Sequence, residues 1–251
     1  MRQPTVDVPE AFDDAAPSYD LMVALNPGYH RHLRSAAHAL VERLPLRSSP
    51  SERPVQLLDL GCGSGASTRA LVTAMRRLSR RFRLIGVDGS TGMLEQARTK
   101  TWPPGVWFEH RRAEDLSAAR ADWGLSEAVD GIFAAYLFRN VSDRDKVLEA
   151  THELLAPGGT LLVHEYSVAD SARARTIWTG ICWSVVIPLS WVLSRDTSLY
   201  RYLWRSVLDF DSVEQFSERM AAAGFVDIEV RTVSGWQRGV LHTFRARRKS
   251  G

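Results

Sequence analysis

The chain has 251 residues, 45% of them hydrophobic and 24% charged, and its formal net charge is +3. These are the values of an ordinary globular protein, enough for one α/β domain and a modest insertion. Two cysteines are too few for a disulfide framework, and the basic run at 245–249 is typical of a solvated tail, so neither an extracellular disulfide scaffold nor a nucleic-acid-binding protein is indicated. The first residues show no signal-peptide pattern, and we expect a cytoplasmic protein.

Residues 1–45 are expected to form a helical cap. A Pro-rich start is followed by a helix from about Tyr29 to Leu44, where apolar residues recur every three or four positions and form one buried face. A Ser/Pro/Arg-rich stretch from Leu46 to Pro54 separates this cap from a core at 55–251.

Residues 55–71 predict a buried strand, a tight turn and the N-terminus of a helix. Apolar residues surround Asp59, and glycines follow at Gly61, Gly63 and Gly65 before the helical spacing begins. Glycines let the backbone approach a ligand closely, and the N–H groups of the first helical turn offer it hydrogen bonds. The stretch therefore predicts a nucleotide site.

The same stretch indicates which nucleotide is bound. The pattern that begins at Gly61 also fits the dinucleotide fingerprint G-x-G-x-x-G/A. However, the additional Gly65 and the carboxylate of Asp59 do not suit a pyrophosphate, whereas an acid suits a cation such as the sulfonium of S-adenosylmethionine. Asp88 follows the glycines by about 20 residues, as ribose recognition requires for either nucleotide.

Strands and helices are predicted to alternate through the core, which implies a parallel sheet with right-handed crossovers. Ligands bind such sheets at the carboxyl ends of the strands, where the strand order reverses. The loops at that edge are 61–65, Asp88, Ala113-Glu114 and 136–140. The predicted strands are 55–60, 82–88, 105–110, 128–135 and 159–166, and the predicted helices are 66–80, 91–100, 114–120 and 143–155.

An insertion at about 170–208 follows the fifth strand. Its stretch from Thr176 to Ser194 is uncharged and rich in tryptophan and aliphatic residues, and its 19 residues approach the length that spans a bilayer. Gly180, Pro188 and several hydroxyl residues interrupt it. We expect a bent helical lid over the site, whose tryptophans line an apolar pocket or touch a membrane surface, with additional core as the alternative.

The chain is predicted to end in an antiparallel hairpin. A helix begins near Ser212 and ends at about Gly224, and two alternating segments follow at 225–233 and 240–247.

Three motifs carry a resemblance to a known family. Residues 57–65, 88–94 and 154–163 resemble, in order and spacing, motif I, the acidic loop and the Pro-Gly-Gly turn of class I S-adenosylmethionine-dependent methyltransferases. The resemblance implies a Rossmann-like α/β fold with a mostly parallel seven-stranded sheet and a C-terminal antiparallel hairpin, and S-adenosyl-L-methionine as cofactor, with S-adenosyl-L-homocysteine as product and no metal. The cofactor-binding residues expected are Asp59, Gly61, Gly63, Gly65, Asp88, Gly89, Met93, Ala113, Glu114 and Tyr136.

Further segments narrow the resemblance. Residues 138–146, 12–22 and 200–207 are similar to signatures of the ubiquinone/menaquinone C-methyltransferase family. They imply C-methylation of a lipophilic quinol-like ring; the alternatives are an O- or N-methyltransferase of a secondary metabolite and a binding module without catalysis. The turn after the fourth strand lacks an Asn-Pro-Pro-Tyr-like motif, so nucleic-acid base methylation is not expected. A homodimer and a peripheral membrane contact are both compatible with the sequence.

Carbon methylation of an aromatic ring needs an ionised ring hydroxyl, because a phenolate pushes electron density onto the adjacent carbon. Arg139 is predicted to stabilise the developing oxyanion, since a guanidinium does not readily release a proton. Asn140 is expected to orient the ring oxygen or a water, and Tyr19 to close the cap with its hydroxyl toward Arg139. His164, at a strand end, is either a general base or a structural histidine.

Overall fold

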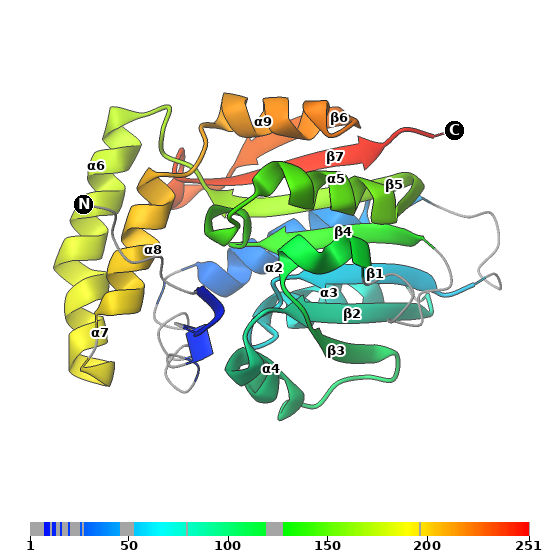
Figure 1. The fold of residues 1–251 in the computed structure, drawn as a ribbon, viewed down its shortest axis with the longest axis horizontal. Coiled ribbons are helices and arrows are strands. Elements are labelled where there is room, and N and C mark those ends of the chain that lie inside the picture. The colour runs from blue at the N-terminus through cyan, green and yellow to red at the C-terminus, as the bar shows by residue number, and fades with distance from the viewer. Residues whose placement is uncertain are drawn as a thin grey trace.

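A computed structural model describes residues 8–10, 12–13, 16, 20, 26, 28–45, 53–78, 80–118, 128–195 and 197–250. Its centre is one seven-stranded sheet with the strand order β3-β2-β1-β4-β5-β7-β6 (Figure 1). Strands β1 to β5 pair in parallel, whereas β7 pairs antiparallel with both β5 and β6. The strands are β1 Val55–Leu60, β2 Phe82–Asp88, β3 Val106–His110, β4 Val129–Ala135, β5 Leu155–Tyr166, β6 Phe225–Thr232 and β7 Leu241–Arg248.

This sheet confirms the predicted fold class, and its pattern of burial explains why the sequence forms it. Strand β4 is buried at every residue, because helices cover both faces of the sheet. Strand β5 begins earlier than predicted, because Leu155 pairs with Val129 before an irregularity in the register near the Pro-Gly-Gly turn.

Helices cover the two faces of the sheet in separate groups. One face packs against α2 and α3, and the other against α5 and α9. The short helix predicted at 114–120 is a 3-10 helix, and several helices end a few residues before their predicted ends. The helices are α2 Tyr29–Val41, α3 Ala66–Arg76, α4 Thr91–Arg98, η1 Ala113–Ala118, η2 Phe138–Asn140, α5 Arg144–Leu154, α9 Val213–Ala222 and η4 Gly235–Gln237.

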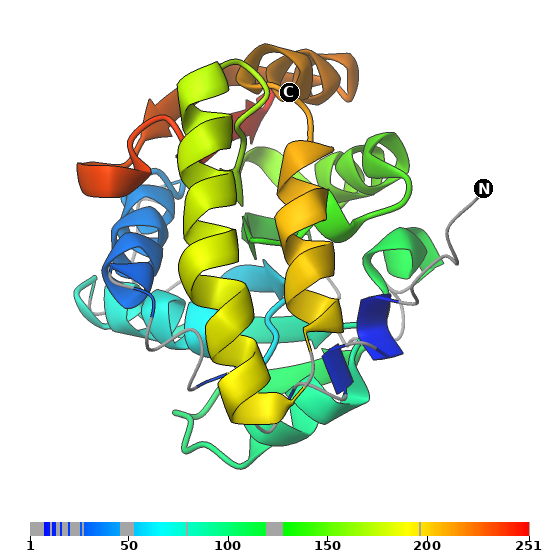
Figure 2. The ribbon, with the colours of Figure 1, turned by 90° about the vertical axis from the view of Figure 1, so that its left-hand side faces the viewer.

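A helical layer, hereafter the lid, stands beside the edge of the sheet where β4 ends. It consists of α6 Ala172–Ile181, the π-helix η3 Cys182–Val186, α7 Ile187–Ser194 and α8 Ser198–Leu208. Figure 2 shows α6, η3 and α7 following one another, with α8 alongside. Pro188 lies in the first turn of α7, where its missing N–H is tolerated. Among the residues described, no helix is both long and apolar enough to cross a membrane.

Candidate active site

The turn between β1 and α3 has the backbone that its glycines allow. Gly61, Gly63 and Gly65 all have positive φ angles, of +72°, +52° and +92°. A Cβ atom at Gly61 would lie 2.9 Å from the side chain of Leu137, so the turn passes close to the end of β4. Side chains would strain or block this turn, which explains the alternate glycines.

Asp88 lies at the end of β2, beside the glycine turn. Its two carboxylate oxygens accept hydrogen bonds from the backbone N–H groups of Gly63, at 2.7 Å, and Ser90, at 2.9 Å. Burial raises the pKa of this carboxyl, although the two N–H groups oppose the shift. A carboxylate has about four lone-pair positions, so Asp88 can accept further bonds, such as those from two ribose hydroxyls.

Asp59 lies beneath the turn and not in a cavity wall, which differs from its expected contact with the cofactor. Its Oδ2 accepts hydrogen bonds from the hydroxyls of Ser67 and Thr68, at 2.7 and 2.6 Å, both in the first turn of α3. Its Oδ1 is buried and has no hydrogen-bond partner among the described residues. Burial raises the pKa of Asp59 to about 7.

The first cavity, of about 120 Å³, lies above the turn between β1, β2 and β4, and we call it the nucleotide cavity. It combines an acid, Asp88, with an apolar wall that includes Met93 and Ala113. These features fit an adenosine bearing a positively charged group. Gly65 lies outside it, on the far side of the turn. Of the expected cofactor-binding residues, Gly61, Gly63, Asp88, Gly89, Met93, Ala113, Glu114 and Tyr136 line it.

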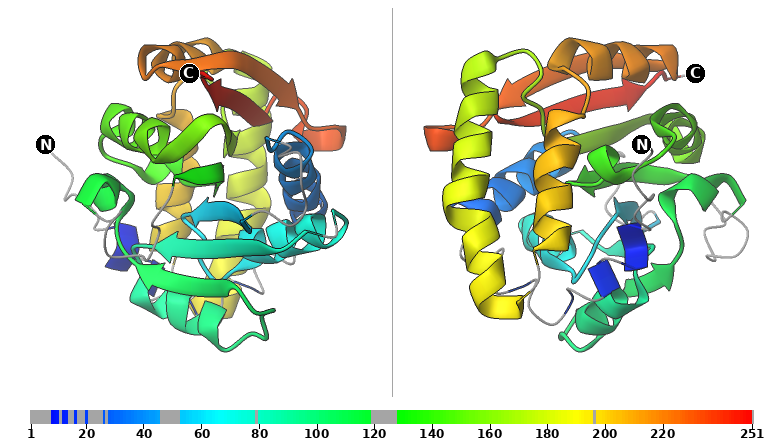
Figure 3. Two further views of the ribbon diagram at one scale, coloured as in Figure 1. Left: turned by 90° about the vertical axis from the view of Figure 1, so that its right-hand side faces the viewer. Right: turned by 60° about the vertical axis from the view of Figure 1, so that its left-hand side comes forward.

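The described N-terminal residues lie over this cavity, between α4 and α8 (Figure 3). Pro9 and Phe12 line its outer wall. Asp13 binds the start of α4, accepting from the Ser90 hydroxyl and, at 2.8 Å, from the N–H of Gly92.

A second contact ties this segment to the glycine turn. Asp20 accepts from the Ser64 hydroxyl and forms an ion pair with Lys100 at 2.6 Å. The Lys100 ammonium also donates to the carbonyl of Ser64, at 2.7 Å. The N-terminal segment is thus held to both loops that bound the nucleotide cavity.

The second cavity, of about 170 Å³, lies between the end of the sheet and the lid, and we call it the lid cavity. It shares Tyr29 and Tyr136 with the nucleotide cavity, so the two adjoin. Its walls are mostly aromatic and aliphatic, as an apolar ligand requires. The lid contributes Trp178, Ile181, Cys182, Val185, Val186, Leu189, Tyr200, Leu203, Trp204 and Val207.

Tyr136 lines both cavities where they adjoin. Its backbone has a φ angle of +58°, which is unusual for a residue other than glycine. Its ring stacks between those of Tyr29 and Tyr166, at centroid distances of 5.3 and 5.2 Å. Its hydroxyl is buried and has no hydrogen-bond partner within the described parts of the chain, and burial raises its pKa well above the usual value.

Arg139 lies on η2 and lines the lid cavity, where a buried carboxylate holds it. Its Nη1 is 2.5 Å from Oε1 of Glu165, whose side chain is fully buried at the end of β5. The guanidinium lies 5.7 and 5.6 Å from the ring centroids of Tyr136 and Tyr166. Sequence reasoning did not identify Glu165 as a site residue. The available signal was a lone acid in an apolar strand, one strand away from the turn that carries Arg139.

The other predicted site residues occupy several places. Asn140 lines the nucleotide cavity, and its side-chain NH₂ donates to the carbonyl of Tyr136 at 3.1 Å. Glu114 accepts from the N–H and hydroxyl of Ser142 at the cavity rim. Tyr19 falls outside the described residues, so its role stays a prediction.

His164 lies near the end of β5. Burial lowers the pKa of His164 to about 3, and its Nδ1 is 2.8 Å from the Thr243 hydroxyl, an arrangement that suits a structural histidine.

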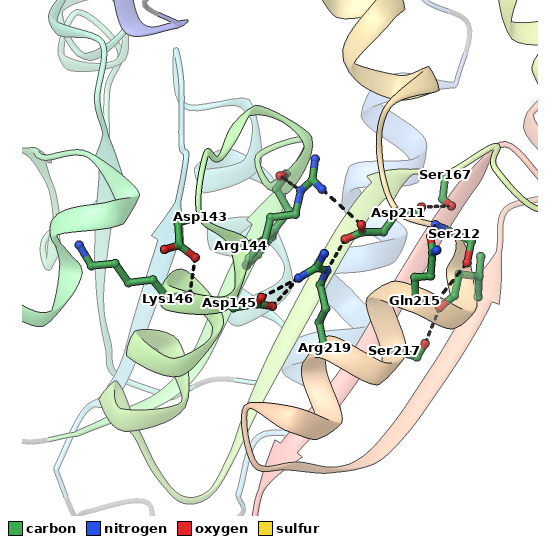
Figure 4. Close-up of polar contacts among 12 residues, drawn as sticks. Asp143, Arg144, Asp145, Lys146, Ser167, Asp211, Ser212, Gln215, Ser217 and Arg219 are labelled. Carbon is green, nitrogen blue, oxygen red and sulfur yellow. Dashed lines mark hydrogen bonds and ion pairs between the residues drawn. The ribbon is translucent and has the colours of Figure 1, made fainter.

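A polar network supports η2 from behind (Figure 4). The Arg144 guanidinium donates to the carbonyl of Phe138, at 3.2 Å, and to Asp211, at 3.3 Å. Arg219 on α9 binds both Asp211 and Asp145. Because Asp211 follows α8, the network connects the lid to the turn that carries Arg139.

Comparison with known proteins identifies a family and several relatives of this chain. A model of the ubiE/COQ5 methyltransferase family matches residues 2–245. The chain is 31% identical to the demethylmenaquinone methyltransferase of Bacteroides fragilis, covering 90% of this chain and 87% of that one. It is 26% identical to the ubiquinone/menaquinone biosynthesis C-methyltransferase UbiE of Idiomarina loihiensis, covering 91% and 86%.

A solved structure shows the same fold. Phosphoethanolamine N-methyltransferase 2 of Haemonchus contortus, in complex with S-adenosyl-L-methionine, superposes with a TM-score of 0.61 at 18% identity. The superposition covers 100% of this chain and 62% of that one. At this sequence identity, the structural similarity supports a common fold and nothing more specific.

Proposed function

Because the chain belongs to the ubiE/COQ5 methyltransferase family and is an S-adenosylmethionine-dependent methyltransferase, we propose that it methylates a ring carbon of a lipophilic, menaquinol-like aromatic. The observation that carries this proposal is the junction of the two cavities at Tyr29 and Tyr136. A methyl donor in the nucleotide cavity and an aromatic acceptor in the lid cavity would meet there. The relatives, a demethylmenaquinone methyltransferase and a ubiquinone/menaquinone biosynthesis C-methyltransferase, support the same class of acceptor.

The lid cavity suits a flat aromatic ring with an apolar tail. Tyr136, Tyr166 and Trp178 form successive ring contacts with centroid distances of 5.2 and 4.8 Å along its wall. Such rings pack favourably against another aromatic ring. The aliphatic lid residues beyond them give an apolar tail a path away from the reacting centre.

Arg139 is the residue proposed to act on the acceptor oxygen. When the ring hydroxyl loses its proton, the guanidinium stabilises the resulting oxyanion, and the electron pair moves to the adjacent ring carbon. Bound S-adenosylmethionine supplies a methyl group on a sulfonium. That ring carbon forms a bond to the methyl carbon as the carbon–sulfur bond breaks and its electron pair stays on sulfur. The ring regains aromaticity when the hydrogen on the methylated carbon leaves as a proton to solvent. The protein contributes alignment of the two reactants and exclusion of water.

Labelled S-adenosylmethionine tests this proposal directly. Incubation with a short-chain demethylmenaquinol should give a product with label on a ring carbon, located by mass spectrometry and NMR. Arg139→Ala should lower turnover and leave the affinity for the methyl donor unchanged. Label on oxygen or nitrogen would support the alternative, a methyltransferase of secondary metabolites. No transfer to quinols or to a panel of phenolic metabolites would contradict the proposal.

A further inference from the structure

The outer surface of the lid carries an unusual set of exposed side chains. The residues are Trp183, Val185, Trp191 and Val192, which are 46%, 54%, 52% and 70% exposed. With the neighbouring Trp236 of η4, they make up five of the six large hydrophobic residues that are exposed among the described residues. We call these five residues the lid patch.

Two arginines contact tryptophans of the lid patch. The guanidinium of Arg195 lies 5.9 Å from the ring centroid of Trp191, and that of Arg201 lies 5.6 Å from the ring centroid of Trp183. Over residues 172–208 the sequence has five arginines and a single aspartate. By contrast, the charged residues that line the groove between α5 and α9 are mostly acids, among them Asp145 and Asp211, so the lid is more basic than that groove.

The lid patch is continuous with the lid cavity. Val185 and Trp236 belong to the exposed patch and also line the cavity. A molecule leaving the cavity past these two residues emerges among the exposed tryptophans. Figure 2 shows that α6 and α7 form the outermost layer on this side of the protein.

We propose that the lid patch docks on the surface of a bilayer containing anionic phospholipids, so that the lid cavity receives its acceptor from the membrane. This inference rests on the proposed function for the acceptor, but the docking itself does not depend on methyl transfer. Tryptophan is favoured at the boundary between headgroups and acyl chains, and arginines nearby are attracted to anionic headgroups. The combination of exposed tryptophan, flanking arginine and an apolar cavity mouth fits a lipid surface.

Vesicle sedimentation tests the docking. The full-length protein should co-sediment with phosphatidylcholine vesicles that contain phosphatidylglycerol, and less with pure phosphatidylcholine or at high salt. The double variant Trp183→Ser/Trp191→Ser should bind on the order of tenfold more weakly, because two interfacial anchors are lost. Leu78→Ser is the matched control, because Leu78 is exposed but lies at the end of α3, away from the lid. It should bind like the wild type.

A kinetic comparison separates docking from chemistry. Trp183 and Trp191 line neither the nucleotide cavity nor the lid cavity, so the double variant should methylate a water-soluble acceptor at the wild-type rate and lose activity only toward a long-chain acceptor embedded in vesicles. Thermal melting of the variant should match the wild type. If the wild type binds vesicles but transfers no methyl group, the proposed function is contradicted and the docking is still supported.

Two results would overturn the docking. One is equal vesicle binding by the wild type and the double variant. The other is a stable wild-type dimer in sedimentation velocity that the double variant dissociates, because the lid patch would then be covered by a second copy of the chain.

Discussion

Tyr136 combines an unusual backbone with an unusual side chain. Its backbone is in the left-handed conformation, the residue lines both cavities, and its hydroxyl is buried without a partner among the described residues. Strained conformations and unpaired polar atoms persist where the surroundings impose them, and they concentrate at functional sites. The acceptor's ring oxygen is the partner we expect for this hydroxyl.

Replacement of this hydroxyl tests that expectation. Tyr136→Phe should lower kcat/KM for the acceptor about tenfold, the cost of one hydrogen bond, without changing the affinity for the methyl donor. Because the Tyr136 hydroxyl makes no hydrogen bond within the described residues, the thermal stability of the variant should equal or exceed that of the wild type. The matched control is Tyr166→Phe: the Tyr166 hydroxyl accepts from Asn26 and Gln237, so its removal should lower stability. Unchanged acceptor kinetics in Tyr136→Phe would contradict the assignment.

Glu165 is the counter-charge of Arg139, and its removal should affect both stability and turnover. Glu165→Gln leaves a buried guanidinium without its carboxylate, which should cost about 3 kcal/mol of unfolding free energy. We expect kcat to fall while the dissociation constant of the methyl donor stays constant, since Arg139 does not line the nucleotide cavity. Glu165→Asp, which keeps the charge, should recover part of both. Full turnover in Glu165→Gln would show that Arg139 needs no positioning by Glu165.

The raised pKa of Asp59 predicts that cofactor binding is linked to proton release. Its pKa of about 7 lies above the usual 3.8, so the folded protein binds more protons than the unfolded chain between about pH 4 and 7. Stability from this group is therefore full at about pH 4 and falls as the pH rises toward 7. A cation bound above Asp59 favours the carboxylate, so S-adenosylmethionine should release more protons on binding at pH 7 than S-adenosylhomocysteine, which has no sulfonium.

Calorimetry in buffers of different ionisation enthalpy measures this difference. In Asp59→Asn the two ligands should release equal numbers of protons, and the fall in stability between pH 4 and 7 should be smaller. A difference that persists in Asp59→Asn would assign the proton to another group, with Asp88 the first candidate because its pKa is also raised.

At the scale of elements, we expect the N-terminal segment, whose Pro9 and Phe12 line the nucleotide cavity, to cover that cavity. Asp13→Asn weakens its contact with the start of α4, where the helix dipole and two donors favour a carboxylate. We expect the methyl donor to dissociate about fivefold faster, with association nearly unchanged, as stopped-flow fluorescence would measure. Glu10→Gln, an exposed residue of the same segment, is the control. Equal dissociation rates in the two variants would argue against a covering role.

The sequence predicted elements better than contacts between them. The apolar run before Asp59 and the alternate glycines specify a strand and a turn locally, which is why the β1 range was correct to the residue. The short helix after β3 was harder, because a 3-10 helix of six residues has too few turns for a periodic pattern. The aromatic wall of the lid cavity joins residues as far apart as Tyr29 and Trp204, and no local pattern encodes that pairing.

At the scale of the whole molecule, the two ends of the parallel strands differ. Both cavities lie at the C-terminal ends of these strands, whereas an ion pair lies at their N-terminal ends. Asp130, at the start of β4, accepts two hydrogen bonds from Arg53, at 2.8 and 3.2 Å, and one from the N–H of Gln56, at 2.8 Å. The sequence places Arg53 in a loop and gives no sign of this contact.

This division predicts that stability and activity can be separated. Asp130→Ala should lower the unfolding free energy by about 2 to 3 kcal/mol, because the ion pair with the half-buried Arg53 and the hydrogen bond from the Gln56 N–H are lost, while kcat at a permissive temperature stays unchanged. Asp209→Ala removes the exposed pair with Arg205 and should cost less than about 1 kcal/mol. Chemical denaturation of both variants checks the difference, and a loss of kcat in Asp130→Ala would refute the separation.

Both cysteines of the chain line a cavity, Cys62 the nucleotide cavity and Cys182 the lid cavity. A thiolate in either place would compete with the acceptor, because ionised sulfur is a strong nucleophile toward an electrophilic carbon. Burial raises the pKa of Cys62 well above its usual value and that of Cys182 to about 12, so both remain neutral thiols. We therefore expect neither sulfur to be alkylated by the enzyme's own methyl donor during turnover.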